Sequence, residues 1–531
     1  MKKLTLIILL LFPAIISAQV VSEVRSAVDN AIPGDNVLRF YRLAIPVAYS
    51  SFDEDLGGGY GNVLEFWQEC EAFVNSVFVP LGICFDVVED KRLVMQGPNL
   101  IDESIYNATS YGTELANEAI GADAYDVGMW VVHRSEYAEN SGLSIDGGAY
   151  QQSTKCSGYA KTDKWVVAHE LGHMFGAPHT VTGEGSLMDS GGEFFSYPSI
   201  KKIREASVRH GIAGAFSAHE VLNSAPVFDF SLMKECYRIP QGACMSVPLY
   251  AADADGHTVT YAAIGCSSST VDDVIEGGDD LAFASLHPAL DNVVDYRPRF
   301  YADIFDDSYY YVQSGTDVPS MYPGLYSIAF LVNDVPQDSS YEALVASPFY
   351  SNYAVWDAKV EVVAGTPFKA SLYPQKDEYR AGEKVAVEWG VNNSYFGADS
   401  RVRITLSTDY GRTFGYVLAE SVPARDGSCV VELPNVNVGN VDVDFVTAVR
   451  SMPGGIIRVE EIGGVAYTLT ALSPEQGGCF VVVGGEETAV NAPAADKGAD
   501  VLYDLSGRML PRRTVPETGV YISRGRKCLI R

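Results

Sequence analysis

Three histidines and one glutamate fall within eleven residues of the chain, as His169, Glu170, His173 and His179. His169 and His173 are four residues apart, so on a helix they share one face and can bind the same metal ion. Gly176 allows the chain to leave that helix at little conformational cost and to return His179 as a third ligand. Three imidazoles leave the fourth tetrahedral position of a zinc ion open, as a catalytic zinc site requires.

Glu170 adjoins the first of these histidines and is expected beside the metal, not among its ligands. Zinc lowers the pKa of a bound water, and a neighbouring carboxylate can accept the proton as the water attacks a peptide carbonyl and then donate it to the leaving amine. The pattern therefore predicts Glu170 as the general base and His169, His173 and His179 as zinc ligands. Chance spacing or a purely structural site is disfavoured, because the 531 residues contain only eight histidines.

The elements that position this motif follow from hydrophobic spacing. A helix is expected at about 163–175, with Leu171 on the face opposite both histidines, so that one face contacts the core and the other the metal. Asp163 or Thr162 can cap its start. Strands and helices mix as far as about residue 222. The expected elements are strands at 39–49, 83–88 and 126–133, helices at 62–79 and 200–209, and a Gly-rich extended segment at 142–150.

The extended motif resembles that of the metzincin zinc peptidases, and Met188 matches the methionine turn of that clan. In the clan this methionine packs beneath the zinc ligands. Astacin-like and serralysin-like members carry Tyr where this chain has Ser190, so the chain is more similar to bacterial reprolysin-like peptidases, although Thr180 replaces the Asp of animal members. The resemblance covers about residues 37–222. It implies an α/β metzincin catalytic domain and a zinc metalloendopeptidase that hydrolyses peptide bonds in proteins.

The N-terminus indicates export. Lys2 and Lys3 precede an apolar run from Leu4 to Ile16, and small residues follow, which is typical of a secretory signal peptide at 1–18. The run is too short for a membrane anchor, and no later stretch could span a bilayer. A short leader follows at 19–36. The formal net charge of −30 argues against nucleic acid and anionic membranes as partners.

The remainder of the chain reads as β-structure. Short segments rich in Val, Tyr and Thr alternate with turn residues, which predicts two antiparallel β-sandwiches, at 223–364 and 366–481, followed by a linker at 484–499. The first resembles a cadherin-like domain and the second an Ig-like or fibronectin-like domain. The predicted fold class is therefore multidomain, with an α/β catalytic domain, two β-sandwiches and a small β segment at the C-terminus.

Two further features of the β-rich part have competing interpretations. Asp253 and Asp255 could bind Ca²⁺, but an acidic turn that ends at Gly256 is favoured. Cys236 and Cys244 are close enough in sequence to form a disulfide in an exported protein. Buried free thiols are at least as well supported, and the odd number of cysteines, nine, leaves one unpaired.

The last segment, 500–531, is basic in an otherwise acidic chain, with seven Arg or Lys against two acids from Val501 onward. Its sequence at 502–508, 519–523 and 527–531 resembles the C-terminal sorting domain of type IX (Por) secretion. That resemblance implies outer-membrane secretion machinery as a partner and the outside of a Gram-negative bacterium as the location. The alternative is a small hairpin that closes the last sandwich.

Other functions compete with an exported endopeptidase. A surface adhesin or scaffold could retain an inactive zinc-binding peptidase domain, and a zinc hydrolase could act on a non-peptide bond. The intact Glu170 favours an enzyme, with protein or peptide substrates bound as an extra strand along 142–150. Asp35 could occupy the open zinc position before activation, although a turn leading into the first strand is favoured.

Overall fold

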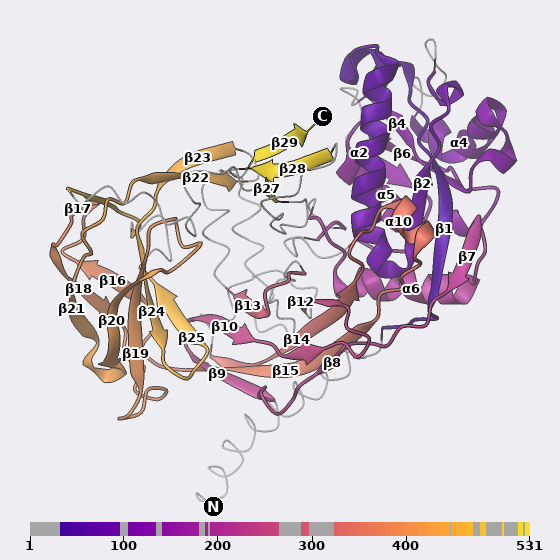
Figure 1. The fold of residues 1–531 in the computed structure, drawn as a ribbon. Helices are drawn as coiled ribbons and strands as arrows, with labels where there is room; N and C mark the ends of the chain where they lie inside the picture. Colours follow the sequence, from indigo (N-terminus) through magenta and orange to yellow (C-terminus); the bar gives the residue numbers. More distant parts are fainter. Residues whose placement is uncertain are drawn as a thin grey trace, which may run out of the picture.

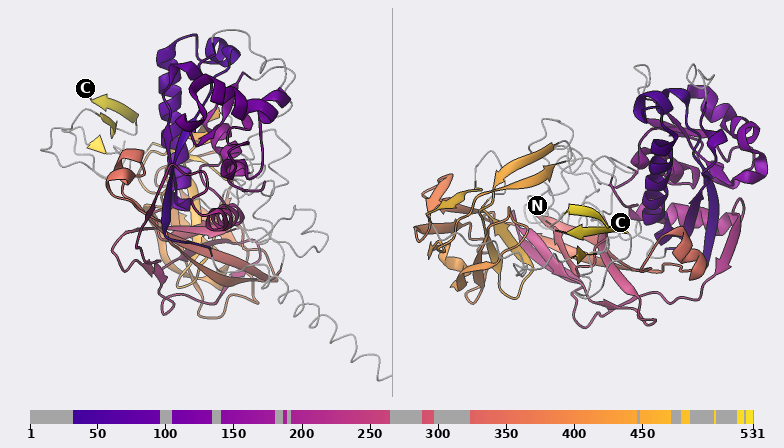
Figure 2. Two further views of the ribbon diagram at one scale, coloured as in Figure 1. Left: turned by 90° about the vertical axis from the view of Figure 1, so that its right-hand side faces the viewer. Right: turned by 45° about the horizontal axis from the view of Figure 1, so that its top comes forward.

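A computed structural model describes most of the chain (Figure 1). The described residues are 32–95, 105–133, 141–179, 186–188, 192–264, 288–296, 323–445, 448–470, 478–484, 502–503, 519–523 and 526–530. The predicted signal peptide and all of the predicted linker except its first residue lie outside these ranges. An N-terminal α/β domain stands at one end of the molecule, and β-rich regions extend from it (Figures 1 and 2).

The first sheet of the N-terminal domain is built around β1 (Val37–Ala44), most of whose residues are buried. β1 pairs in parallel with β2 (Ile83–Val87) along one edge. Along its other edge it pairs with β3 (Val127–Gly128), in parallel, and with β7 (Ser217–Glu220), antiparallel. A central strand of this kind is covered on both faces, which agrees with its many buried residues, although Arg39 and Arg42 interrupt its apolar sequence.

A second, smaller sheet carries the strands next to the histidine motif. Its order is β4 (Trp130–Val132), β6 (Gly158–Lys161) and β5 (Gly142–Ser144). β4 runs parallel to β6, and β5 runs antiparallel to it. In the described part of the chain β5 pairs with β6 alone, so β5 is the outer strand.

Four helices lie in the described residues of this domain: α2 (Tyr60–Phe78), α4 (Ile105–Ile120), α5 (Lys164–Met174) and α6 (Tyr197–His210). α2 packs against β2 and α5, and its buried Trp67 donates a hydrogen bond of 2.9 Å to the carbonyl of Ile45. The helices predicted at 62–79, 163–175 and 200–209 are thus confirmed with small shifts. Short π- or 3₁₀-helices lie at η1 (Ser51–Asp55), η2 (Val79–Leu81), η3 (Lys91–Leu93) and η4 (Ala122–Ala124).

Three predicted extended segments were too long. The strand expected at 39–49 ends at Ala44, shortly before Pro46, which has no N–H to donate to a sheet. The strand expected at 126–133 is divided at Met129 between the two sheets. The segment expected at 142–150 is a strand only to Ser144, and after Gly147, whose φ is 69°, it forms the 3₁₀-helix η5 (Gly148–Tyr150).

The β-rich part holds antiparallel sheets in both predicted regions, as expected for β-sandwich domains. The first region contributes the sheet β12 (Thr258–Ile264), β14 (Gly324–Val335), β15 (Tyr353–Val363) and β9 (Cys236–Pro240), in which β9 alone is parallel to its neighbour. It also holds α10 (Tyr341–Ala346) and the pair β8 (Val227–Phe228) and β11 (Ala251–Ala252). The second region contains β16 (Ala370–Tyr373), β18 (Lys384–Trp389) and β21 (Ser428–Glu432) in one sheet.

One sheet crosses the predicted boundary near Gly365. Its order is β13 (Val293–Tyr296), β10 (Cys244–Pro248), β25 (Ala466–Leu469), β24 (Ile456–Glu461), β19 (Arg401–Ser407) and β20 (Tyr416–Pro423). The β10–β25 pairing joins the two regions, and one hydrophobic core extends through both. The remaining described elements are β17 (Glu378–Arg380), β22 (Asn440–Phe445), β23 (Ala448–Pro453), β26 (Val481–Val483), η7 (Ala424–Asp426), β27 (Leu502–Tyr503), β28 (Gly519–Ser523) and β29 (Arg526–Ile530).

Cys236 and Cys244 are the two cysteines that the sequence suggested as a possible disulfide pair. Cys236 is a free, exposed thiol, so of the two alternatives for this pair the structure supports free thiols over a bridge to Cys244. The two residues lie in strands of different sheets, β9 and β10.

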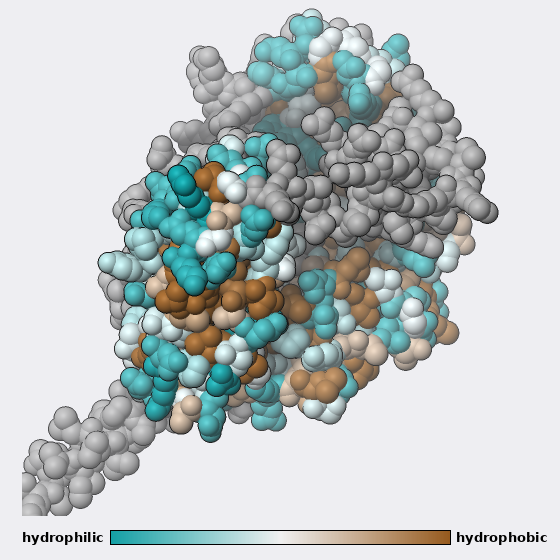
Figure 3. All heavy atoms as spheres, turned by 60° about the vertical axis from the view of Figure 1, so that its left-hand side comes forward, coloured by the Kyte–Doolittle hydropathy of each residue, from teal (hydrophilic) through white to brown (hydrophobic). Residues whose placement is uncertain are grey.

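Within the described ranges, no helix combines the length and apolar character needed to cross a bilayer. Apolar side chains nevertheless gather in patches on the face drawn in Figure 3.

Candidate active site

The motif helix α5 is fixed at its start and along its buried face. The carboxylate of Asp163 accepts a hydrogen bond of 2.9 Å from the amide of Trp165, which caps the first turn. Leu171 and Met174 are fully buried, as predicted for the face that contacts the core. The helix therefore has one rigid orientation, and His169 and His173 lie together on its other side.

The turn at the end of α5 brings His179 back toward the other two histidines. Gly176 has a φ of 96°, which is strained for any residue with a Cβ, and its amide donates to the carbonyl of His173. The amide of Ala177 then bonds the carbonyl of Gly172 over 2.8 Å, which closes the helix end. His179 follows immediately and is exposed. The predicted role of Gly176 is therefore confirmed.

The three imidazoles converge. The Nε2 atoms of His169 and His179 lie 3.2 Å apart, and one ring nitrogen from each of the three histidines lies within 4.8 Å of the others. The Nδ1 atoms of His169 and His173 are each 2.7 Å from a backbone carbonyl, those of Leu187 and Ala177. A carbonyl can only accept, so each Nδ1 must carry the proton. Each Nε2 then offers a lone pair toward the shared space.

This donor set fits a zinc ion. Two ligands at about 2.0–2.1 Å from a tetrahedral zinc lie roughly 3.4 Å apart, close to the observed separation of the two Nε2 atoms. Burial lowers the pKa of His173 to about 4, so this imidazole is neutral near pH 7 and able to bind metal. His169, His173 and His179 would hold the ion, which would act as a Lewis acid toward a water and a substrate carbonyl.

Glu170 lies on the buried side of this group, with only 5% of its surface exposed. The hydroxyl of Ser144 in β5 donates to its carboxylate over 2.8 Å and also lies 3.0 Å from its backbone carbonyl. Burial raises the pKa of Glu170 to about 7, and the bond from Ser144 opposes that rise. A carboxyl group with a pKa near neutrality can both accept and release a proton, as a general base and acid must.

Two glycines allow this close packing. A Cβ at Gly142 would lie 2.5 Å from Oε1 of Glu170, so β5 can approach the carboxylate only without a side chain at that position. A Cβ at Gly172, in α5, would lie 2.6 Å from Sδ of Met188. Met188 is fully buried beneath the helix at this point, in the position that the methionine turn implies.

Several residues that contribute to the candidate active site were not predicted from the sequence. Ser144 and Gly142 lie in the segment expected to bind substrate, but no spacing in the sequence links them to Glu170. Gly172 occupies a variable position of the motif. The carbonyl of Leu187 contributes only backbone, so no residue type could identify it. Contacts of this kind depend on how separate segments pack, and the local pattern does not encode them.

Two other residues that the sequence suggested as possible metal ligands, Asp35 and Asp255, have other partners in the structure. The carboxylate of Asp35 forms an ion pair with Arg39 and accepts the amide of Val37 over 3.1 Å. The structure therefore supports the turn before β1 over a zinc-blocking role. Asp255 accepts the amide of Ser224, and its own amide donates to Asp253, as in an acidic turn.

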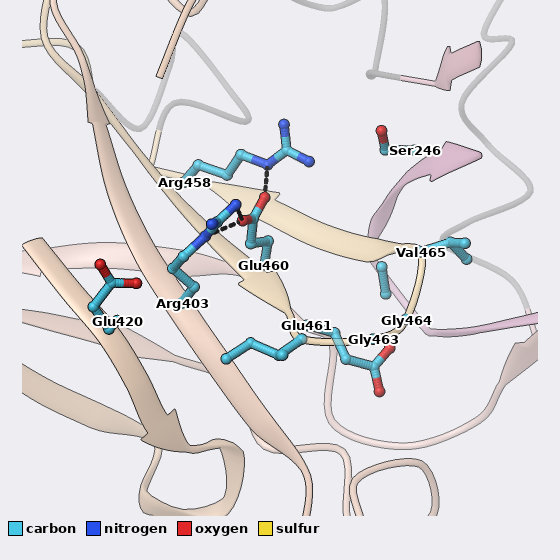
Figure 4. Close-up of a pocket in the computed structure, with 11 residues that line it drawn as sticks. Ser246, Arg403, Glu420, Arg458, Glu460, Glu461, Gly463, Gly464 and Val465 are labelled. Carbon is cyan, nitrogen blue, oxygen red and sulfur yellow. Dashed lines mark hydrogen bonds and ion pairs between the residues drawn. The ribbon is translucent and has the colours of Figure 1, made fainter. Parts of the chain in front are cut away.

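A separate hollow lies in the second β region (Figure 4). Its two basic residues, Arg403 and Arg458, both pair with Glu460, which balances one of their two positive charges. Neither histidine nor cysteine is among its lining residues. The hollow therefore lacks the imidazole ligands that are gathered at residues 169–179.

Comparison with known families supports a peptidase in the N-terminal domain. The model of Metallo-peptidase family M12B Reprolysin-like matches residues 70–180, a range that includes Glu170 and all three histidines. Met188 lies just beyond the matched range. This supports a hydrolase of the metallopeptidase kind in this part of the chain. No protein of curated function matches the chain.

Solved structures are similar to the chain only at a low level. They include the N-terminal four Ig domains of Dscam1 isoform 4.44, at 9% identity and a TM-score of 0.14, covering 49% of this chain and 46% of that one. Fibronectin(III)-like modules of Clostridium thermocellum CbhA have 11% identity and a TM-score of 0.14, covering 46% and 92%. Human Protocadherin-24 EC1-2 has 12% identity and a TM-score of 0.16, covering 49% and 99%. The chain thus spans about half the length of the first of these, and TM-scores this low carry no functional argument.

Proposed function

We propose that the chain is a secreted zinc-dependent metalloendopeptidase. The observation that carries this proposal is the convergence of three imidazoles beside a buried carboxylate held by Ser144, with the Nδ1 atoms of His169 and His173 fixed by backbone carbonyls. A structural zinc site has no need of that carboxylate. The family match over residues 70–180 supports the same conclusion.

Each residue has a separate task in this proposal. His169, His173 and His179 hold the zinc ion. Glu170 takes a proton from the attacking water and passes it to the amine that leaves when the peptide bond breaks. Ser144 fixes the direction of the Glu170 carboxylate through its hydroxyl.

Strand β5 is proposed to bind the substrate backbone. It is the outer strand of its sheet in the described chain, and its Leu143 is exposed. Ser144 of the same strand contacts Glu170, so a peptide paired with β5 passes the catalytic carboxylate. Backbone pairing supplies affinity that is independent of sequence, and neighbouring side chains supply specificity.

The decisive test is Glu170→Gln, which retains the shape of the side chain but removes its basicity. This variant should keep its zinc and lose cleavage of a peptide library by about a hundredfold or more, as expected for loss of a general base. Zinc content and turnover should be measured on the same preparation. Undiminished cleavage by Glu170→Gln would contradict the role of Glu170, whereas no zinc-dependent cleavage by the parent protein would favour an inactive adhesin or scaffold.

The segment 500–531 is proposed as the export address. Its described strands form a small sheet of their own, β27–β28–β29, so it need not serve the catalyst. Deleting it from the full chain should leave peptide cleavage by the purified protein unchanged and abolish its appearance outside a Gram-negative host. Cell fractionation measures the second effect. Normal delivery of the shortened chain would contradict an address function.

A further inference from the structure

A second group of side chains that could hold a metal ion lies in the first β region. Asp253 is in the turn after β11, His257 directly precedes β12, and Asp334 is near the end of β14. Nδ1 of His257 lies 3.3 Å from Oδ1 of Asp253 and 3.8 Å from Oδ2 of Asp334. One ligand atom from each residue lies within 4.8 Å of the other two, so all three can reach one ion.

The two carboxylates are buried although they carry charge. The side chain of Asp334 is 0% exposed and that of Asp253 is 1% exposed. Two adjacent buried negative charges are costly unless cations balance them, and one imidazole can balance at most one of them.

Several buried polar atoms in and beside this group of side chains lack hydrogen-bond partners. Oδ2 of Asp253, Nδ1 of His257 and Oδ1 of Asn223 are all buried, and none accepts or donates a hydrogen bond within the described structure. Asn223 contacts Asp334 through its amide nitrogen, so its oxygen belongs to the same pocket. Native proteins satisfy almost all buried polar atoms, and several unsatisfied lone pairs together are what a missing cation leaves behind.

We propose that Asp253, His257 and Asp334 bind a second divalent metal ion of the transition-metal kind, such as Zn²⁺. The imidazole decides this choice, because Ca²⁺ takes oxygen ligands whereas imidazole suits zinc and its neighbours. Asp255 is not among the ligands, because its exposed carboxylate accepts the amide of Ser224. The ion is distinct from the catalytic zinc and uses none of the residues at 169–179.

The position of the proposed site indicates a structural role for the ion. Asp334 accepts hydrogen bonds from the amide of Asn352 and from Asn223. The side chain of Asn352 in turn donates to Asn36, immediately before β1, and to the carbonyl of Asn223. An ion on Asp334 therefore fixes the network through which the first β region is attached to the central strand of the N-terminal domain.

The test counts zinc per chain in full-length protein carrying Glu170→Gln, which prevents self-digestion. His257→Phe keeps a ring against Phe349, whose ring lies 5.0 Å from that of His257, but removes the nitrogen ligand. Asp253→Asn keeps the oxygen that accepts the amides of Asp255 and His257, so the turn can still form. Asp255→Asn is the matched control in the same turn.

Mass-spectrometric metal analysis after equilibration with Zn²⁺ should show one zinc fewer in His257→Phe and Asp253→Asn than in the parent, and no loss in Asp255→Asn. The difference between variants is the measure, so the result does not depend on whether the catalytic zinc is retained. Equal zinc content in all four proteins would overturn the proposal, leaving only ion pairs at His257. Calcium binding that is lost in Asp253→Asn and Asp255→Asn, without any loss of zinc, would overturn the choice of metal.

Discussion

At the scale of single residues, the catalytic carboxylate depends on its neighbours as much as on its place in the motif. Glu170 is nearly buried, and the hydroxyl of Ser144 is the side-chain donor that orients it. A hydrogen bond to a charged group contributes about 1.5–3 kcal/mol. Ser144 is therefore a positioning residue whose loss should be measurable without any change in the metal ligands.

Ser144→Ala should lower kcat/KM by about tenfold to a hundredfold, because the hydrogen bond that aligns Glu170 is lost. Zinc content should stay unchanged, since Ser144 contacts none of the three histidines. Peptide cleavage and metal analysis on one sample give both values. Ser141→Ala is the control, because Ser141 is exposed and contributes its backbone carbonyl to Lys161. Equal losses in the two variants would refute a positioning role.

At the scale of elements, the contact between α5 and Met188 needs a helix without a side chain at Gly172. Alanine is normally the better helix former by about 1 kcal/mol. Here the added Cβ would lie 2.6 Å from Sδ of Met188 and 3.1 Å from the Phe195 ring, both of which are buried. The steric cost should therefore outweigh the gain in helix propensity.

Gly172→Ala should lower the free energy of unfolding by about 1–3 kcal/mol, the usual cost of overpacking a core, and should weaken zinc binding by displacing α5. Gly61→Ala in α2 is the matched control, because nothing lies within 4 Å of its added Cβ. It should instead gain about 0.5–1 kcal/mol. Thermal unfolding of both variants measures these changes in stability. A Gly172→Ala variant more stable than the parent would show that Met188 does not constrain the helix.

At the scale of the whole molecule, the N-terminal domain and the first β region share packing. Leu344, in α10 of the β region, is buried in one cluster with Leu38, Phe40 and Cys84 of the N-terminal domain. The buried Arg204 of α6 donates to the carbonyl of Ser351 and lies over the ring of Tyr350, 4.6 Å from its centroid. The β region therefore supports the domain that carries the active site.

Leu344→Ala should destabilise the protein by about 2–5 kcal/mol and shorten the time for which activity survives heating, although residue 344 is distant in sequence from the motif. Val345→Ala in the same helix is the control, since Val345 is 52% exposed and should change stability by about 0.5 kcal/mol or less. Residual peptidase activity after graded heating measures both. Identical inactivation of the two variants would mean that the regions unfold independently.

The sequence by itself determined the candidate metal ligands, the carboxylate proposed as the general base, the helix that carries them and the alternation of an α/β part with β-rich parts. These features are local, since the spacing of His169 and His173 on one helix, and the turn at Gly176, follow from backbone geometry over a few residues. The helix at 164–174 agrees with the predicted range, and Leu171 and Met174 are buried on it as predicted.

Only the tertiary structure decided which distant residues meet. It brought Ser144 to Glu170 and the carbonyl of Leu187 to His169, and it ended the predicted substrate strand at Ser144. It joined β10 to β25 across the predicted boundary and gathered Asp253, His257 and Asp334 from three separate segments. Such contacts are set by how whole elements pack to bury apolar surface and satisfy polar groups, and no short stretch of sequence contains that information.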